Sequence, residues 1–239
     1  LYPVKTAFAV MYSLCGYVIL YGSCFTPWMD IVALFPLLML ALDRLLTTGK
    51  KLFYIFMVAL SFIINYYLSA MALIYVFLAS GVYILLLCER KEWKKHAWNL
   101  GIGTVAGMGL SCFVLIPVFM QLSGSQRGNA GGSIVSQYLG WIKGAIVTDG
   151  SMAAFQRYMM LYGLSFVLAV ILIGLKKYKE DKKMCRVMAC LLGIALLPMF
   201  VEGINLMWHF GSYNGYTLRN GFLIAFTLLC MGAYYAQKM

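Results

Sequence analysis

Long apolar runs separated by short polar segments dominate this sequence. Their lengths match helices that cross a hydrocarbon core of about 30 Å, and none shows the short alternating segments of an outer-membrane barrel. The pattern predicts an all-α fold, a polytopic transmembrane helical bundle with about eight spans. The expected spans cover residues 6–25, 31–47, 52–68, 70–88, 97–122, 158–175, 187–201 and 221–236.

The boundary between the third and fourth spans has no basic residue to mark it. The 37 residues between Lys51 and Glu89 include no Lys or Arg and are too many for one membrane-crossing helix. Asn accepts the unusual backbone angles of a tight turn, and Tyr favours the membrane interface. We therefore predict two helices joined by a turn near Asn65, Tyr66 and Tyr67.

Composition supports the membrane assignment, and the positions of the basic residues indicate how the chain is oriented in the membrane. Hydrophobic residues make up 63% of the chain and charged residues 11%, whereas about 25% of residues in soluble domains are charged. In a soluble protein the net charge of +11 would raise the question of nucleic acid. Here 15 of the 19 basic residues fall on one side when the loops alternate across the bilayer, and the positive-inside rule makes that side cytoplasmic. The lipid bilayer, not nucleic acid, is the expected partner.

This orientation places both ends of the chain in the cytoplasm and the functional loops outside. The long external segment 123–157 includes Ile134, Tyr138 and Ile142 at helical spacing, which predicts an interfacial amphipathic helix. We expect residues 1–239 to form a single transmembrane domain. Because the chain begins without an initiator Met or a cleavage site, we interpret it as an internal fragment of a larger protein.

The sequence has no recognisable nucleotide-binding or nucleophile motif. There is no P-loop and no recognisable Ser/His/Asp arrangement, which argues against an ATP-driven pump built on this chain alone. The seven cysteines include no Cys-x-x-Cys pair and are interpreted as small core residues. The fifth span has closely spaced glycines that favour close helix packing over nucleotide binding: Gly101, Gly103, Gly107 and Gly109.

The stretch 202–222 concentrates ionisable residues between two apolar runs. An ionisable side chain near the bilayer centre costs roughly 2.5 to 3.5 kcal/mol on insertion scales, so Glu202, His209 and Arg219 are expected at an interface or in a lined cavity. Trp208 beside His209 pairs a stacking ring with a group that titrates near neutrality, which suits sugar binding and proton transfer. A purely structural role for this pair stays open.

Three further residues have both a structural and a functional interpretation. Trp28 and Asp30 are either an aromatic-belt residue and a helix cap, or a wall and a carboxylate of an external cavity. Arg127 is either a solvated loop charge or a bidentate phosphate clamp. No cofactor is certain; a divalent metal ion is the candidate, on His209 with Glu202, Asp30 or Asp149, although no ligand-spaced pair exists.

Five segments occur in an order typical of one bacterial family. They read MYSLCGYVILYG, WMDIVALFPLLMLALDRLL, INYYLSA, LSCFVLIPVFMQLSGSQRG and INLMWHFGSYNGYTLRNGF. Across nearly its whole length the chain resembles the YfhO family. Where that family usually reads Phe-Pro-Tyr-Arg-Tyr-Ser-Phe, this chain has Tyr-Thr-Leu-Arg-Asn-Gly-Phe at 216–222 and clearly keeps only the Arg and the final Phe.

The resemblance implies a glycosyltransferase of the GT-C type in the bacterial plasma membrane. Such an enzyme moves a sugar from a polyprenyl-phosphate carrier to a cell-surface polymer such as teichoic acid, on the outer face. It also implies a catalytic acid in the first external loop, ahead of this segment. The residues to which the resemblance assigns roles are His209 and Asp30 for catalysis, and Arg219, Arg127, Trp208, Trp28, Asn65 and Tyr66 for substrate binding.

Two other classes of function remain alternatives. A transporter or flippase of a lipid-linked sugar would line a path across the bilayer with the same charges, although the inverted repeats typical of transporters are not evident. A non-catalytic subunit that organises surface-polymer assembly would need none of the site residues for chemistry.

Overall fold

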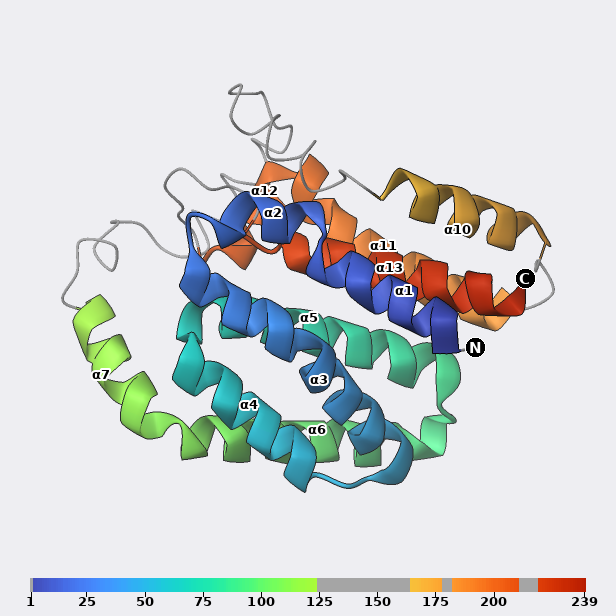
Figure 1. The fold of residues 1–239 in the computed structure, drawn as a ribbon. Helices are drawn as coiled ribbons and strands as arrows, with labels where there is room; N and C mark the ends of the chain where they lie inside the picture. The colour runs from blue at the N-terminus through green and yellow to red at the C-terminus, as the bar shows by residue number, and fades with distance from the viewer. Residues whose placement is uncertain (1, 124–163, 178–181, 211–218) are drawn as a thin grey trace.

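The protein is an all-α helical bundle in the computed structural model, which describes residues 2–123, 164–177, 182–210 and 219–239 (Figure 1). This confirms the predicted fold class, and the described part of the chain has no strand. The helices are α1 (Tyr2–Ser13), α2 (Gly16–Gly22), α3 (Thr26–Thr48), α4 (Leu52–Ile64), α5 (Tyr66–Leu87), η1 (Arg90–Glu92), α6 (Trp93–Leu110), α7 (Cys112–Ser123), α10 (Ser165–Lys177), α11 (Lys182–Phe200), α12 (Glu202–Trp208) and α13 (Gly221–Lys238).

The number of membrane-crossing helices among the described residues is smaller than predicted. Three stretches are long and apolar enough to cross a membrane, namely Pro3–Gly22, α3 and α5, and α6 with α7 makes a fourth if the bent pair counts as one span. Part of the difference comes from helix breaks, which apolar runs do not reveal, and the predicted span 158–175 lies partly outside the described residues. Asn65 ends α4 after only 13 residues, and a break at Ser111 bends α7 away from α6 by 76°.

The turn predicted near Asn65 is present and is one residue long. The Asn65 side chain caps α5 by accepting a hydrogen bond from the Leu68 amide at 3.1 Å. Its Nδ2 also donates to the Pro27 carbonyl at 3.4 Å. The same side chain therefore starts α5 and ties the turn to the beginning of α3.

Two of the four glycines expected to pack closely, Gly103 and Gly107, do so, whereas Gly101 and Gly109 have no neighbour within 4 Å of an added Cβ. A Cβ at Gly107 would lie 2.7 Å from Val58 Cβ, and one at Gly103 would lie 2.9 Å from Tyr54. Both glycines face α4, and the Tyr54 hydroxyl hydrogen-bonds Thr104 Oγ1 at 3.0 Å in the same interface. Small residues here let the two helix backbones approach, as is common between membrane helices.

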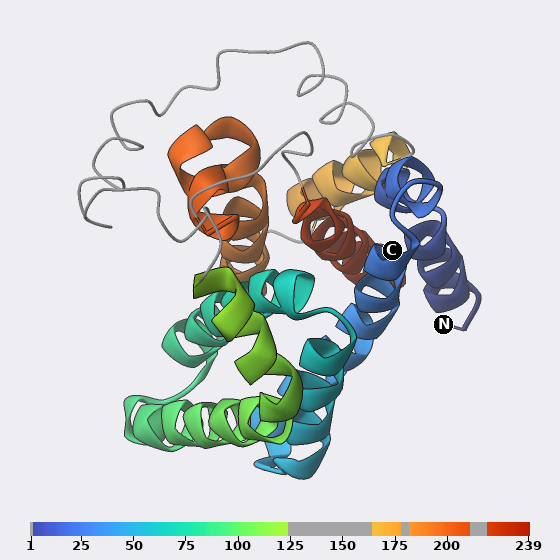
Figure 2. The ribbon, with the colours of Figure 1, turned by 90° about the vertical axis from the view of Figure 1, so that its left-hand side faces the viewer.

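Helices α3, α5 and α13 meet in the centre of the bundle. The Phe35 ring packs edge-on against Phe222 at 5.3 Å and against Tyr75 at 5.7 Å. The Thr227 hydroxyl donates to the Leu223 carbonyl at 2.6 Å, so the Tyr75 hydroxyl is the donor in its 2.7 Å bond to Thr227. Around this centre α13 packs against α1, α10 and α11, and α4 packs between α3 and α6 (Figures 1 and 2).

Helix α3 is long enough to run from one side of a bilayer core to the other. Its 23 residues span about 35 Å at 1.5 Å per residue, which matches the thickness of a bilayer core. Trp28 lies at its first end, and Thr48 lies at its last. The predicted orientation makes the first end external and the second cytoplasmic.

Several predicted features lie outside the described residues. These are the amphipathic helix and the external loop expected in 123–157, whose only described residue is Ser123. Arg127 and Asp149 lie in this segment as well, so their proposed roles stay predictions.

Candidate functional site

Arg219 lies beside the beginnings of two helices, α3 and α5. Its Cζ is 5.5 Å from the centre of the Trp28 ring and 5.2 Å from the centre of the Tyr67 ring. Trp28 belongs to the first turn of α3, and Tyr67 to the first turn of α5. Cation–π contacts of this kind are worth about 0.5 to 2 kcal/mol, more when desolvated. The two rings therefore favour one position of the guanidinium.

A third contact fixes the backbone of Arg219. The Tyr17 hydroxyl, on α2, donates to the Arg219 carbonyl at 2.9 Å. The Tyr17 side chain is fully buried and also packs on Tyr21 at 4.7 Å and on Phe222 at 5.6 Å. Arg219 is thus positioned through both its main chain and its side chain.

Aromatic neighbours hold the Trp28 indole in place. Phe25 stacks on it at 4.4 Å with an interplanar angle of 15°, and Tyr21 packs against it at 5.2 Å. Trp28 remains half-buried, so part of its surface is accessible. A partly accessible indole beside a cation is a suitable contact for both an apolar chain and a sugar face.

The Asn65 turn positions Tyr67 opposite Trp28. Because Asn65 bonds the carbonyl that precedes Trp28, the beginning of α5 is tied to the beginning of α3. Tyr66 is exposed and packs edge-on against Tyr67 at 6.5 Å. Among these predicted residues, the structure gives Asn65 a positioning contact; whether Asn65 or Tyr66 also touches substrate stays a prediction.

His209 lies at the end of α12 and is neutral. It is 1% exposed, and its Nδ1 lies 2.7 Å from the Asn205 carbonyl. A carbonyl only accepts, so Nδ1 carries the hydrogen and Nε2 has the lone pair. Burial lowers the pKa of His209 from 6.5 to about 4; the Asn205 hydrogen bond opposes this shift and the nearby charge of Arg219 adds to it. At neutral pH, therefore, His209 cannot act as a proton donor through an imidazolium.

Trp208 and Phe210 flank His209 in different environments. Trp208 is 4% exposed, so its indole is packed in the core, and its stacking on a sugar stays a prediction. Phe210 has a φ of 54°, the left-handed region that non-glycine residues rarely adopt. This conformation turns the chain after α12 and places the Phe210 ring 6.2 Å from Tyr67. The end of α12 thereby reaches the group around Arg219.

Asp30 lies near this group in the sequence but on another side of α3. It is exposed two residues after Trp28, and positions i and i+2 of a helix do not face the same way. It takes part in none of the ion pairs found among the described residues. Its assignment to proton transfer stays a prediction.

Asn220 follows Arg219 in the chain and is a candidate residue that sequence reasoning missed. Its side chain is fully buried at the start of α13, and neither Oδ1 nor Nδ2 has a hydrogen-bond partner in the described structure. Leaving such groups unsatisfied costs about 1 to 3 kcal/mol each. A costly buried amide next to Arg219 is a sign of a functional constraint at this position.

The described residues do not offer an evident metal site. No group of three or more His, Cys, Asp or Glu side chains among them is close enough to hold an ion. The divalent metal ion stays a prediction, because Asp149, one of its candidate ligands, lies outside the described residues.

The sequence matches a known protein family over nearly its whole length. The family described as "Bacterial membrane protein YfhO" matches residues 2–239. The chain belongs to the YfhO family. No protein with a curated description and no solved structure matches it. The predicted family is thus confirmed, and the protein is a membrane protein.

The geometry brings several of the expected site residues close to one another. Of the YfhO-like motif residues, Trp28 and Arg219 are in contact, Asn65 is joined to them through Pro27, and His209 approaches through Phe210. The YfhO chain adds four aromatic members that the motifs did not identify as site residues: Tyr17, Tyr21, Phe25 and Tyr67. Tyr17 and Tyr21 are four residues apart in an apolar segment, which was the available signal.

Proposed function

We propose that this YfhO-family protein is a membrane glycosyltransferase of the GT-C type. It would take a sugar from a polyprenyl-phosphate carrier and transfer it to a cell-surface polymer, such as teichoic acid, on the outer face of the bacterial plasma membrane. The observation that carries this proposal is the Arg219 guanidinium over the rings of Trp28 and Tyr67.

The chemistry of the donor explains why such an arginine is useful. A hydroxyl oxygen of the acceptor attacks the anomeric carbon, and the bond from that carbon to the phosphate oxygen breaks. The electron pair leaves with the carrier phosphate, which gains negative charge. A guanidinium can hydrogen-bond two phosphate oxygens at once, and a fixed cation aimed at developing charge lowers the barrier.

The neighbouring residues suit the other parts of the donor. The accessible part of Trp28 suits a sugar face or the first isoprene units of the carrier. The buried amide of Asn220 could hydrogen-bond sugar hydroxyls and so satisfy both of its polar atoms. The proton of the acceptor hydroxyl passes to a carboxylate of the protein, for which Asp30 is the candidate in this chain. Neutral His209 acts as a hydrogen-bond acceptor through Nε2.

The bend between α6 and α7 is the feature that a transporter would share, because transporters often use broken helices. Such breaks normally lie near the bilayer midplane. Here the break follows 18 helical residues, or about 27 Å of helix. That length nearly crosses a hydrocarbon core of about 30 Å, so the bend suits an interface. The transferase remains the better-supported proposal.

The test replaces Arg219 by Ala in the intact protein. Membranes are supplied with labelled polyprenyl-phosphate sugar, and the label bound to surface polymer is measured. We expect transfer to fall by about 100-fold or more, the range seen when a group that stabilises transition-state charge is removed. Arg90→Ala is the matched control, because Arg90 lies 5.9 Å over Trp93 at the opposite end of the bundle.

Three outcomes separate the alternatives. Unchanged transfer in Arg219→Ala would overturn the proposed function. Movement of labelled carrier between leaflets of reconstituted vesicles, without any transfer to acceptor, would favour a flippase. If deletion of the whole chain abolishes transfer but Arg219→Ala and Trp28→Leu do not, the protein is a non-catalytic subunit.

A further inference from the structure

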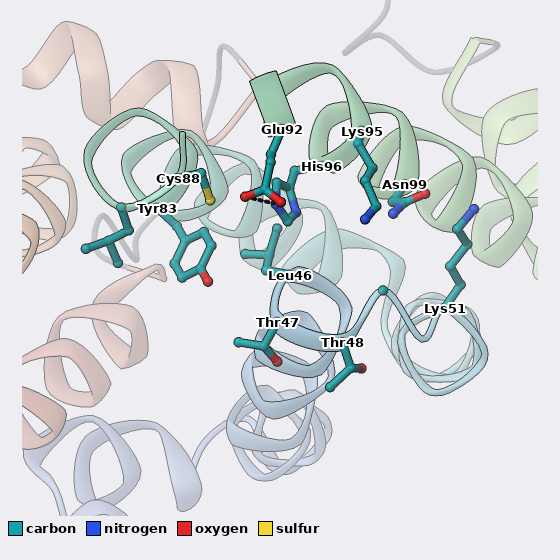
Figure 3. A pocket seen from close by; sticks show the side chains of 12 residues that line it. Leu46, Thr47, Thr48, Lys51, Tyr83, Cys88, Glu92, Lys95, His96 and Asn99 are labelled. Carbon is teal, nitrogen blue, oxygen red and sulfur yellow. Dashed lines mark ion pairs between the residues drawn. The ribbon is translucent and has the colours of Figure 1, made fainter. Parts of the chain in front are cut away.

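A polar cavity lies at the end of the molecule opposite Arg219. It has a volume of about 630 Å³ and lies between the end of α3, the end of α5 and the beginning of α6 (Figure 3). Gly49, with a φ of 74°, ends α3 in the left-handed conformation and turns the chain toward Lys51. The cavity is independent of the site around Arg219, because most of the length of α3 separates the two.

Nitrogen donors line one side of this cavity. Lys95 and Asn99 are one turn apart on α6, and their nitrogen ends lie next to each other, while Lys51 enters from the α3–α4 connection (Figure 3). Within the described structure, the ion pairs join Lys91 to Glu89 and His96 to Glu92. Lys51 and Lys95 have no carboxylate partner there, so both ammonium groups are available to a ligand.

Glu92 is the one carboxylate among the residues that line the cavity. The Glu92 carboxylate lies 4.0 Å from His96 Nε2. The Thr47 and Thr48 hydroxyls donate to the carbonyls of Asp43 and Arg44 at 2.7 and 2.6 Å. Helices α3 and α5 end here while α4 and α6 begin here, so the helix-end charges oppose one another. Two lysines therefore stand against one carboxylate, and the net side-chain charge of the lining is positive.

Apolar side chains next to this cavity are turned outward. Leu52, which follows Lys51, is 84% exposed, and Trp98, which precedes Asn99, is 70% exposed. In a membrane protein such residues meet lipid chains, and Trp favours the level of the headgroups. A ligand that reaches Lys51 and Asn99 can thus have an apolar part beside Leu52 and Trp98.

We propose that this cavity binds a phosphate group, and that the phosphate belongs to the headgroup of an anionic lipid. Two ammonium groups and an amide form three hydrogen-bond donors for phosphate oxygens. The predicted orientation places the cavity at the cytoplasmic leaflet, where anionic lipids are concentrated and basic pockets between helices bind their headgroups. The exposed Leu52 and Trp98 distinguish a lipid from a soluble phosphate ligand.

The test measures lipid binding by the intact protein purified in a neutral detergent. Thermal unfolding is followed while short-chain phosphatidylglycerol, short-chain phosphatidylcholine or inorganic phosphate is added. We expect phosphatidylglycerol to raise Tm and to bind about tenfold more tightly than phosphatidylcholine, whose choline charge is repelled by the two lysines. Inorganic phosphate at high concentration should compete with the lipid.

Variants identify the cavity as the binding site. The double variant K51Q/K95Q should weaken phosphatidylglycerol binding by at least about tenfold, as expected for a lost charge-assisted hydrogen bond. K50Q/K94Q is the matched control, because Lys50 and Lys94 are exposed neighbours outside the cavity lining. Asn99→Ala, which removes no charge, should weaken binding by a smaller factor and should not disturb folding.

Each result decides the proposal. Equal loss in K51Q/K95Q and K50Q/K94Q would overturn it, because binding would then follow surface charge alone. Equal affinity for phosphatidylcholine would overturn the anionic headgroup. Stabilisation by inorganic phosphate but by neither lipid, lost in K51Q/K95Q, would keep the phosphate site and replace the lipid by a soluble phosphate ester.

Discussion

The Tyr17 hydroxyl and the Arg219 carbonyl oxygen are joined by a 2.9 Å hydrogen bond across 202 positions of sequence. This bond fixes the main chain of the residue whose side chain lies over Trp28 and Tyr67. The position of the Arg219 side chain therefore depends on a buried residue that does not touch its guanidinium.

Tyr17→Phe keeps the ring packing and removes one hydrogen bond. We expect the free energy of unfolding to fall by about 1 kcal/mol and sugar transfer to fall by about tenfold, since small displacements of a binding group are costly. Tyr12→Phe is the control, because the Tyr12 hydroxyl also donates to a backbone carbonyl, that of Val32, at 2.8 Å. Equal transfer rates in the two variants would show that the Tyr17 bond does not position Arg219.

His209 makes stability depend on pH. Burial lowers its pKa from 6.5 to about 4, so between these values the unfolded chain binds a proton that the folded protein excludes. The free energy of unfolding is therefore highest above pH 6.5. It falls by up to about 3 kcal/mol as the pH falls toward 4. Thermal unfolding between pH 7.5 and about 4 should show this loss in the wild type and a flatter profile in His209→Gln. Identical profiles would contradict the assignment of the pH dependence to His209.

Gly107→Ala and Gly109→Ala should have opposite effects. A Cβ at Gly107 would lie 2.7 Å from Val58, whereas one at Gly109 meets nothing within 4 Å. Overpacking costs about 1 to 3 kcal/mol, and Ala in an exposed helix position gains up to about 1 kcal/mol over Gly. We expect Tm to fall for Gly107→Ala and to stay or rise for Gly109→Ala. A similar Tm for both variants would argue against close α4–α6 packing.

Asn220→Leu should raise the stability of the fold and lower sugar transfer. It removes a buried amide whose Oδ1 and Nδ2 lack partners in the described structure, so we expect Tm to rise by the equivalent of about 1 kcal/mol or more while transfer falls. Thr104→Val is the contrasting control, since Thr104 is also buried but is bonded to the Tyr54 hydroxyl at 3.0 Å, and its loss should lower Tm. A lower Tm in Asn220→Leu would mean that the amide serves the fold.

Local patterns in the sequence predicted local structure well. The all-α bundle and its family followed from the apolar runs and the motif order. The turn at Asn65 was predicted because Asn accepts unusual backbone angles; the turn is confirmed, but Asn65 has an extended backbone and its side chain caps α5 instead. Of the four glycines expected to pack closely, Gly103 and Gly107 do so against α4, whereas Gly101 and Gly109 meet nothing within 4 Å. Each of these properties depends on residues near one another in the chain.

The convergence at Arg219 and the number of spans were not predictable in the same way. Whether Trp28, Tyr67 and Tyr17 meet Arg219 depends on how four segments pack, and an apolar residue in a run gives no sign of which neighbour it faces. Likewise, an apolar run does not reveal a break at Ser111. The burial of His209 follows from the same packing.

The single amide group of Asn65 has one further consequence. Its planar geometry links the two hydrogen bonds, because the rotation that aims Oδ1 at the Leu68 amide also aims Nδ2 at the Pro27 carbonyl. The first turns of α3 and α5 are therefore set by the same side-chain torsion angles. A turn of one residue thus sets how the two helices that contact the Arg219 guanidinium begin relative to each other.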